Sequence, residues 1–222
     1  MTVLESLKLR MVGAASTRLQ ALVARRAEKL VAELLVSGAS LWRDEQYHRW
    51  NEHELSCSVR LFYFCDRVLQ ENQDAWPLVR IEYDSAQPTR KMLSGDEDPS
   101  RAPRPDFTIL FGDAKIRIEA KRLRPSGGFP ALYVRHGMAR FIDGRYSSTP
   151  PHPGVMIGYV EDGDPEAIVN QINSVVRAET TFGQTHVLSP LGDPMAAFVL
   201  PFHSVHGNGL RLLHFEVNLQ GA

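Results

Sequence analysis

Residues 105–123 read PDFTILFGDAKIRIEAKRL, and this stretch decides the fold class. Two runs of alternating residues, 106–111 and 114–123, flank the dipeptide Gly112-Asp113. Alternation with a period of two is typical of β-strands, and a Gly-first pair between two such runs favours a tight type II′ turn. The sequence therefore predicts a central β-hairpin.

The predicted hairpin gathers charged side chains on one face. A period of two puts Arg117, Glu119 and Lys121 together on the second strand. With a two-residue turn, Asp106 on the first strand faces Glu119, with Cβ atoms roughly 5 Å apart. Opposed carboxylates repel each other, and a bound divalent cation removes that repulsion. We therefore expect a Mg²⁺ site here, with Lys121 beside it.

The remaining pattern predicts a mixed α/β chain in which a helical extension, residues 1–50, precedes one domain, residues 51–222. Apolar spacing and turn residues predict helices over 17–35 (ending at Gly38), from Asn51 to Trp76-Pro77, over 131–142, and from the cap Asp164 to about 177. Alternating or apolar runs predict strands over 78–83, 154–160, 196–202 and 210–219. A long loop is expected over 85–104. The last two strands are expected to form a C-terminal β-hairpin.

Composition sets limits on the class of protein. The chain has 222 residues, 43% of them hydrophobic, which is ordinary for one buried core. No apolar run approaches the roughly 18 residues of a membrane span, and no secretory pattern opens the chain, so we expect a cytoplasmic protein. Cys57 and Cys65 are eight apart in one expected helix, roughly 12 Å, which is too far for a disulfide.

Charge is distributed unevenly along the sequence. The net charge is −1, yet residues 101–150 carry ten Lys and Arg against four Asp and Glu, a local surplus of +6. A concentrated basic segment is what a nucleic-acid partner requires. The near-neutral total therefore does not exclude such a partner.

The hairpin resembles the signature of the PD-(D/E)XK, or restriction-endonuclease-like, nuclease superfamily. The residues that carry the resemblance are Pro105-Asp106, followed after twelve residues by Glu119-Ala120-Lys121. The expected order of helix, three-stranded antiparallel meander, helix and strand is similar to that superfamily's core, over about half of the chain. The resemblance implies Mg²⁺, for which Mn²⁺ is expected to substitute, held by Asp106 and Glu119. Lys121 would position the activated water or stabilise developing negative charge.

The resemblance also implies a further carboxylate on the first core helix, which would assist metal binding. Leu55, Ser56 and Val59 follow Glu52 at spacings of three, four and seven, so helix geometry favours Glu52. Glu54 is the alternative. Both glutamates could instead simply stabilise the helix N-terminus.

The function that this resemblance implies is Mg²⁺-dependent endonucleolytic hydrolysis of DNA that leaves a 5′-phosphate, in restriction, antiviral defence or repair. Arginines that follow the motif are candidates for contacts to the nucleic-acid backbone, although a solvated charged face explains them equally well. They are Arg122, Arg124, Arg135 and Arg140, with Arg145 nearby. The expected partners are nucleic acid and either a second copy of the chain, joined through the helix over 18–35 outside the core, or subunits of a larger assembly.

Three other interpretations stay open at this point. The chain could cleave RNA, or could be an inactive nucleic-acid-binding or scaffolding subunit with the same fold. In a purely structural interpretation, Asp106 caps a strand while Glu119 pairs with Lys121 or Arg117. A zinc site at His203, His206 and His214 is disfavoured, because the H-x-x-H lacks helical spacing and no Cys lies nearby.

Overall fold

The computed structural model of the chain describes residues 25–45, 53–84, 104–112, 114–146, 153–179, 184–192, 196–207 and 209–220, with the single residues 94, 96, 98, 102 and 182. It is a mixed α/β structure built on one seven-stranded sheet in the order β1-β2-β3-β4-β7-β6-β5. The strands are β1 (Val79–Tyr83), β2 (Phe107–Phe111), β3 (Ala114–Leu123), β4 (Gly154–Val160), β5 (Ser189–Pro190), β6 (Val199–Val205) and β7 (Arg211–Asn218).

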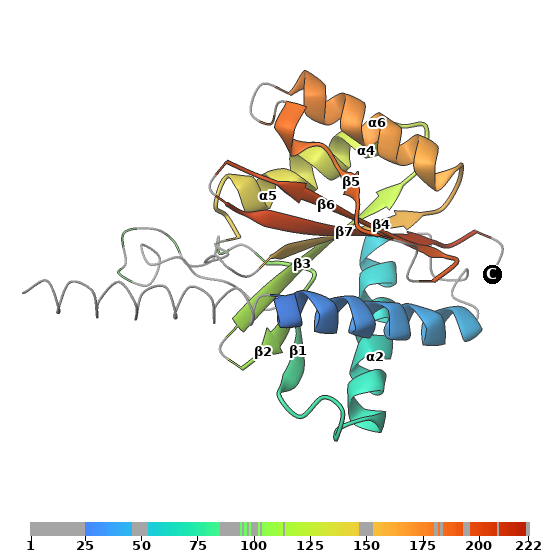
Figure 1. Ribbon diagram of the computed structural model, residues 1–222, viewed down its shortest axis with the longest axis vertical. Coiled ribbons are helices and arrows are strands. Elements are labelled where there is room, and N and C mark those ends of the chain that lie inside the picture. The colour runs from blue at the N-terminus through green and yellow to red at the C-terminus, as the bar shows by residue number, and fades with distance from the viewer. Residues whose placement is uncertain are drawn as a thin grey trace, which may run out of the picture.

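Helices cover both faces of this sheet, as Figure 1 shows. A helix over residues 25–44 and α2 (Glu54–Glu71) lie on one face. The other face carries α6 (Pro165–Ala178) and a helical segment made of α4 (Phe129–Leu132), the π-helix η3 (Tyr133–Met138) and α5 (Ala139–Ile142). A short 3₁₀ turn, η4 (Gln184–His186), follows α6. Each face has its own hydrophobic cluster.

The predicted central hairpin is confirmed, including its register. β2 pairs antiparallel with β3 from Phe111↔Ala114 to Phe107↔Ile118, as a two-residue turn requires. Gly112 has a φ of 57°, which suits a glycine in the first position of such a turn. β1 pairs antiparallel with β2 and completes the expected meander.

The C-terminal hairpin extends this same sheet. β6 and β7 pair antiparallel as expected, but β7 also pairs in parallel with β4, so it lies between β4 and β6. The interior residues of β7 are all buried, as is every residue of β4, which is typical of parallel strands covered on both faces. The sheet is therefore larger than the predicted meander with one added strand.

The N-terminal helix differs from the prediction at its end and in its surroundings. It continues through residue 44, past the expected stop at Gly38. A Cβ at Gly38 would lie 2.5 Å from Cys65 Sγ, so this glycine allows close approach to α2 and does not end the helix. Leu34 and Trp42 are buried in the cluster shared with α2 and the sheet. The expectation that this helix lies outside the core is wrong for its described residues.

Two further helical predictions hold, with shifted bounds. α2 begins at Glu54 with His53 as its N-cap, while the expected start, Asn51, lies outside the described residues. Cys57 and Cys65 both lie on α2, as predicted, and both are buried. Asp164 caps α6 by accepting from the backbone N–H groups of residues 166 and 167.

The helix expected over 131–142 contains a π-helical turn. It begins earlier, at Phe129, after Gly128 in a left-handed conformation. Within the π-helical turn, Gly137 leaves room for the side chains of Met156 and Lys121. Such π-turns occur frequently at functional sites. This one brings the helical segment close to β3.

Within the part of the chain that the structure describes, no helix combines the length and apolar character needed to cross a membrane.

Candidate active site

Asp106 lies immediately before β2 and is anchored to β3 at both backbone and side chain. Its N–H donates to the carbonyl of Ile118 (3.0 Å), and its Oδ2 accepts from the N–H of Ala120 (2.7 Å). Burial, and secondly the nearby Glu119 carboxylate, raise the pKa of Asp106 from 3.8 to about 6. The two carboxylates are therefore close enough to repel each other, as the hairpin register predicted.

Glu119 is the most enclosed acidic group at the site, with 1% of its surface exposed. Its Oε1 accepts from Lys121 Nζ (2.8 Å), and its Oε2 accepts from the Tyr146 hydroxyl (2.6 Å). Arg140 Nη1 donates to both oxygens, at 2.7 and 2.8 Å. Two cations and a hydroxyl thus compensate this buried charge.

Lys121 links Glu119 to α2. Besides Glu119, its ammonium group donates to Glu54 Oε1 (2.7 Å) and to the carbonyl of Ala120 (2.7 Å). Burial acts to lower the pKa of Lys121, but the Glu119 and Glu54 carboxylates outweigh it, so the pKa is raised. The ammonium therefore stays charged, with all three protons directed at acceptors.

The carboxylate that α2 brings to the site is that of Glu54. Its Oε1 binds Lys121, and its Oε2 accepts from the N–H of Arg122 (3.2 Å). Glu52, which the helical spacing favoured, lies outside the described residues. That spacing argument took the helix to begin near Asn51; because α2 begins at Glu54, this residue occupies the first turn, above the end of β3.

Arg140 and Tyr146 are the site residues that sequence reasoning placed elsewhere or missed. Arg140 was a candidate for a backbone phosphate contact, and Tyr146 was not singled out. The Tyr146 hydroxyl also contacts Arg140 Nη1 (2.9 Å) and the carbonyl of Arg104 (2.8 Å). No local pattern encodes contacts across 21 and 27 residues. The only signal was the position of Arg140 in the helix expected over 131–142 and of Tyr146 shortly after it.

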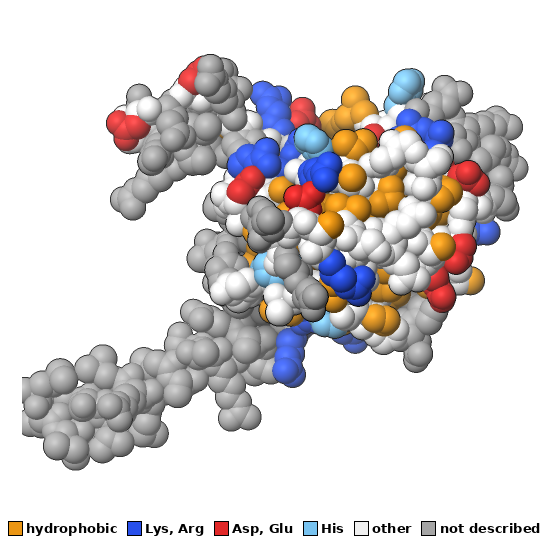
Figure 2. Space-filling view, turned by 90° about the horizontal axis from the view of Figure 1, so that it is seen from above, with side chains coloured by type: hydrophobic (Ala, Val, Ile, Leu, Met, Phe, Trp, Pro, Cys, Tyr) orange, Lys and Arg blue, Asp and Glu red, His pale blue; other side chains and the backbone are white. Residues whose placement is uncertain are grey.

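The other arginines proposed for phosphate contacts have carboxylate partners within the protein. Arg122 and Arg124 both bind Glu161, at 2.6 Å each. Arg135 binds Glu179, and Arg145 binds Asp143. On the face in Figure 2, Lys and Arg side chains stand in small separate groups with acidic side chains nearby. Acidic residues from outside the 101–150 segment thus neutralise part of its surplus.

The donor set suits a hard cation such as Mg²⁺. Asp106 and Glu119 offer carboxylate oxygens, and burial, with a smaller contribution from Glu119, raises the pKa of Asp106. Within the described residues, Asp106 Oδ1 has no hydrogen-bond partner, whereas Glu119 is fully engaged. No cluster of three or more His, Cys, Asp or Glu is arranged for a metal in that part of the chain. A cation would therefore rely on these two carboxylates together with other oxygen ligands.

Two of the three C-terminal histidines, His206 and His214, are bound by neighbouring side chains. Ser204 Oγ contacts His206 Nε2 (2.8 Å) and His214 Nε2 (2.9 Å), while His214 Nδ1 contacts the Tyr133 hydroxyl (2.9 Å). His214 is fully buried. These contacts form a polar network inside the core, which explains two of the histidines without a zinc ion.

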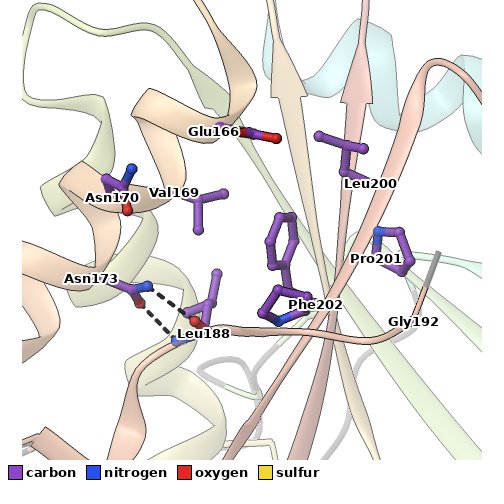
Figure 3. A pocket seen from close by; sticks show the side chains of 10 residues that line it. Glu166, Val169, Asn170, Asn173, Leu188, Gly192, Leu200, Pro201 and Phe202 are labelled. Atoms are coloured by element: carbon purple, nitrogen blue, oxygen red, sulfur yellow. Dashed lines mark hydrogen bonds between the residues drawn. The ribbon is translucent and has the colours of Figure 1, made fainter. Parts of the chain in front are cut away.

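A separate pocket of about 390 Å³ lies between α6 and the strands β5 and β6. Figure 3 shows its apolar lining, with Leu200 and Phe202 on one side and Val169 on the other. Asn173 closes one end by bonding both backbone groups of Leu188, at 2.7 and 3.0 Å. Without paired titratable groups, this pocket offers less chemistry than the carboxylate cluster.

The chain matches no protein-family model and no curated protein. Its function is therefore inferred from the contacts just described.

Proposed function

We propose that this chain is a Mg²⁺-dependent nuclease of the PD-(D/E)XK type. The observation that carries the proposal is the buried Glu119–Lys121 pair (2.8 Å), beside Asp106, which immediately precedes the adjoining strand β2. The resemblance of residues 105–121 to the superfamily signature supports it. So does the topology, in which α2, the β1-β2-β3 meander, the α4–α5 segment and β4 follow one another as in that superfamily's core.

Each residue has a distinct role in the proposed reaction. Asp106 and Glu119 would hold the cation, which supplies Lewis-acid charge and an acidified water when bound. Lys121 keeps a positive charge next to Glu119, where it orients a nucleophile or stabilises negative charge that develops on a phosphate. Glu54 fixes the Lys121 ammonium from the side of α2 and thereby positions it. Glu52 keeps its proposed role of assisting the cation.

The proposed substrate is DNA, hydrolysed to leave a 5′-phosphate, in restriction, antiviral defence or repair. The support is the resemblance together with the basic surplus of residues 101–150. RNA is the alternative substrate. Among the arginines, Arg140 is the best placed for a scissile phosphate, because it lies at the carboxylates themselves.

The first experiment is cleavage of supercoiled plasmid, linear duplex, single-stranded DNA and RNA with Mg²⁺, Mn²⁺ or EDTA. We expect metal-dependent cleavage that Glu119→Gln and Lys121→Met abolish while each variant stays folded. Lys115→Met is the matched control, because Lys115 is an exposed lysine on the same face of β3. Cleavage that persists in Glu119→Gln would refute the assignment.

The second candidate function is a non-catalytic nucleic-acid-binding or scaffolding subunit. The observation in its favour is the saturation of Glu119 by Lys121, Arg140 and Tyr146, which would also serve as a structural ion cluster. In that case, no substrate is cut with any metal, and Glu119→Gln lowers the melting temperature clearly. Binding of a labelled duplex in EDTA would then identify the subunit.

A further inference from the structure

The Glu119 carboxylate has no acceptor position left for a further partner. Lys121 and Tyr146 take one oxygen each, and Arg140 Nη1 contacts both. These four contacts equal the roughly four lone-pair positions of a carboxylate. Because Nη1 lies almost equally far from the two oxygens, 2.7 and 2.8 Å, it sits between them, where a chelated cation would also sit. A cation can therefore reach Glu119 only if one donor moves.

The three donors differ in how firmly they are held. Lys121 has two further acceptors, the Glu54 carboxylate and the Ala120 carbonyl. Tyr146 is buried and also contacts the carbonyl of Arg104. Arg140 is 34% exposed at its side chain, its hydrogen bonds all use Nη1, and its guanidinium also lies over the Tyr146 ring at 5.8 Å. Its Nε and Nη2 have no partner among the described residues, so Arg140 is the donor that moves with the least loss.

A phosphate is the natural destination for the Arg140 side chain. The Nε and Nη2 groups form one edge of the planar guanidinium, which matches two oxygens of a phosphate. Exchange of a carboxylate for a phosphate keeps the arginine paired, whereas withdrawal into water does not. The backbone of Arg140 stays close to Lys121 during this exchange, because α5 follows directly on the π-turn that packs against Lys121.

We propose that Arg140 gates the metal site: its guanidinium occupies the chelating position at Glu119, and a substrate phosphate draws it away so that the cation can bind. The inference rests on the proposed function, since it takes Glu119 as a metal ligand. It makes cation and phosphate binding cooperative, because each removes the same obstacle for the other. The free protein then binds Mg²⁺ weakly and becomes competent only on its substrate.

The test is titration of the full chain with Mn²⁺ alone, followed by electron paramagnetic resonance of the free ion. We expect Arg140→Met to bind Mn²⁺ at least tenfold more tightly than the unchanged protein. Arg135→Met is the matched control, because Arg135 lies in the same helical segment but pairs with Glu179, and it should bind as the unchanged protein does. Glu119→Gln combined with Arg140→Met should lose the gain. Arg140→Gln replaces Arg140→Met if that variant melts early.

A second arm adds sulfate at constant ionic strength as a tetrahedral dianion in place of the phosphate. Sulfate should tighten Mn²⁺ binding severalfold in the unchanged protein and leave Arg140→Met unaffected. Equal or weaker Mn²⁺ binding by Arg140→Met, or an equal response of both proteins to sulfate, overturns the gate while leaving the nuclease proposal standing. If no protein binds Mn²⁺, Arg140→Met included, the gate and the proposed metal site both fail.

Discussion

Glu216 on β7 gives the sharpest test of the core energetics. Its register partners are Gly158, which has no side chain, and Leu200, which is aliphatic. Glu216 is 1% exposed, and neither carboxyl oxygen has a hydrogen-bond partner in the described part of the chain. Burial raises the pKa of Glu216 from 4.5 to about 8. The group therefore keeps its proton at neutral pH.

The sign and size of the effect follow from this difference. A carboxyl whose folded-state pKa lies above its unfolded value costs nothing well below 4.5, and its cost then grows until the pH passes about 8. The two pKa values differ by about 3.5, and each unit corresponds to about 1.4 kcal/mol. Between pH 5 and pH 9 the free energy of unfolding should therefore fall by about 4 kcal/mol from this group alone.

Glu216→Gln removes the titration while keeping the shape of the protonated side chain. We expect the two proteins to differ by less than about 1 kcal/mol at pH 5, and the variant to be more stable by about 4 kcal/mol at pH 9. Urea unfolding at pH 5, 7 and 9 measures both curves. The other buried groups that titrate, such as His206 and His214, are common to both proteins and cancel in the difference. Parallel curves for the two proteins would refute the reasoning, because they would require a solvated or paired carboxyl.

Three further substitutions test the packing that holds the site's scaffold, each by thermal and urea unfolding. Gly38→Ala should lower the free energy of unfolding by about 1 to 3 kcal/mol, because the clash of the new methyl group with Cys65 exceeds the helix-propensity gain of about 1 kcal/mol. A variant more stable than the unchanged protein would contradict the close approach of the two helices. Asn173→Ala should cost about 2 to 4 kcal/mol, because both backbone groups of Leu188 lose their partner, and a neutral result would show that water replaces it. Asp164→Ala should cost about 1 kcal/mol through the lost cap of α6, whereas Asp164→Asn should keep most of it, and equal losses would contradict the capping role.

The hairpin was predictable from the sequence because its information is local. A period of two assigns faces, and a two-residue turn fixes which residues are opposed, so the amino-acid order alone places Asp106 and Glu119 together. The Lys121 ammonium followed from the same periodicity. The choice between Glu52 and Glu54 depended on where α2 begins, and helix ends are poorly encoded by apolar spacing.

The rest of the site depends on contacts between distant segments. Arg140 and Tyr146 reach Glu119 only because the helical segment after β3 folds back over the sheet. The parallel pairing of β7 with β4 likewise has no local signal, since strand order is decided by packing on both faces. Gly38 shows the opposite case, in which a strong local stop signal is overridden by the need of two helices to approach.

The place of β7 in the sheet has a consequence for synthesis on the ribosome. β4 and β6 are both made before β7, and each lacks a neighbour on the edge that β7 will occupy until β7 is inserted between them. During that interval the nascent chain presents an apolar strand with one open edge, which is the kind of surface that invites pairing with other chains. We therefore expect chains arrested before residue 211 to depend on chaperones and to aggregate. Once β7 pairs with both β4 and β6, these open edges are covered.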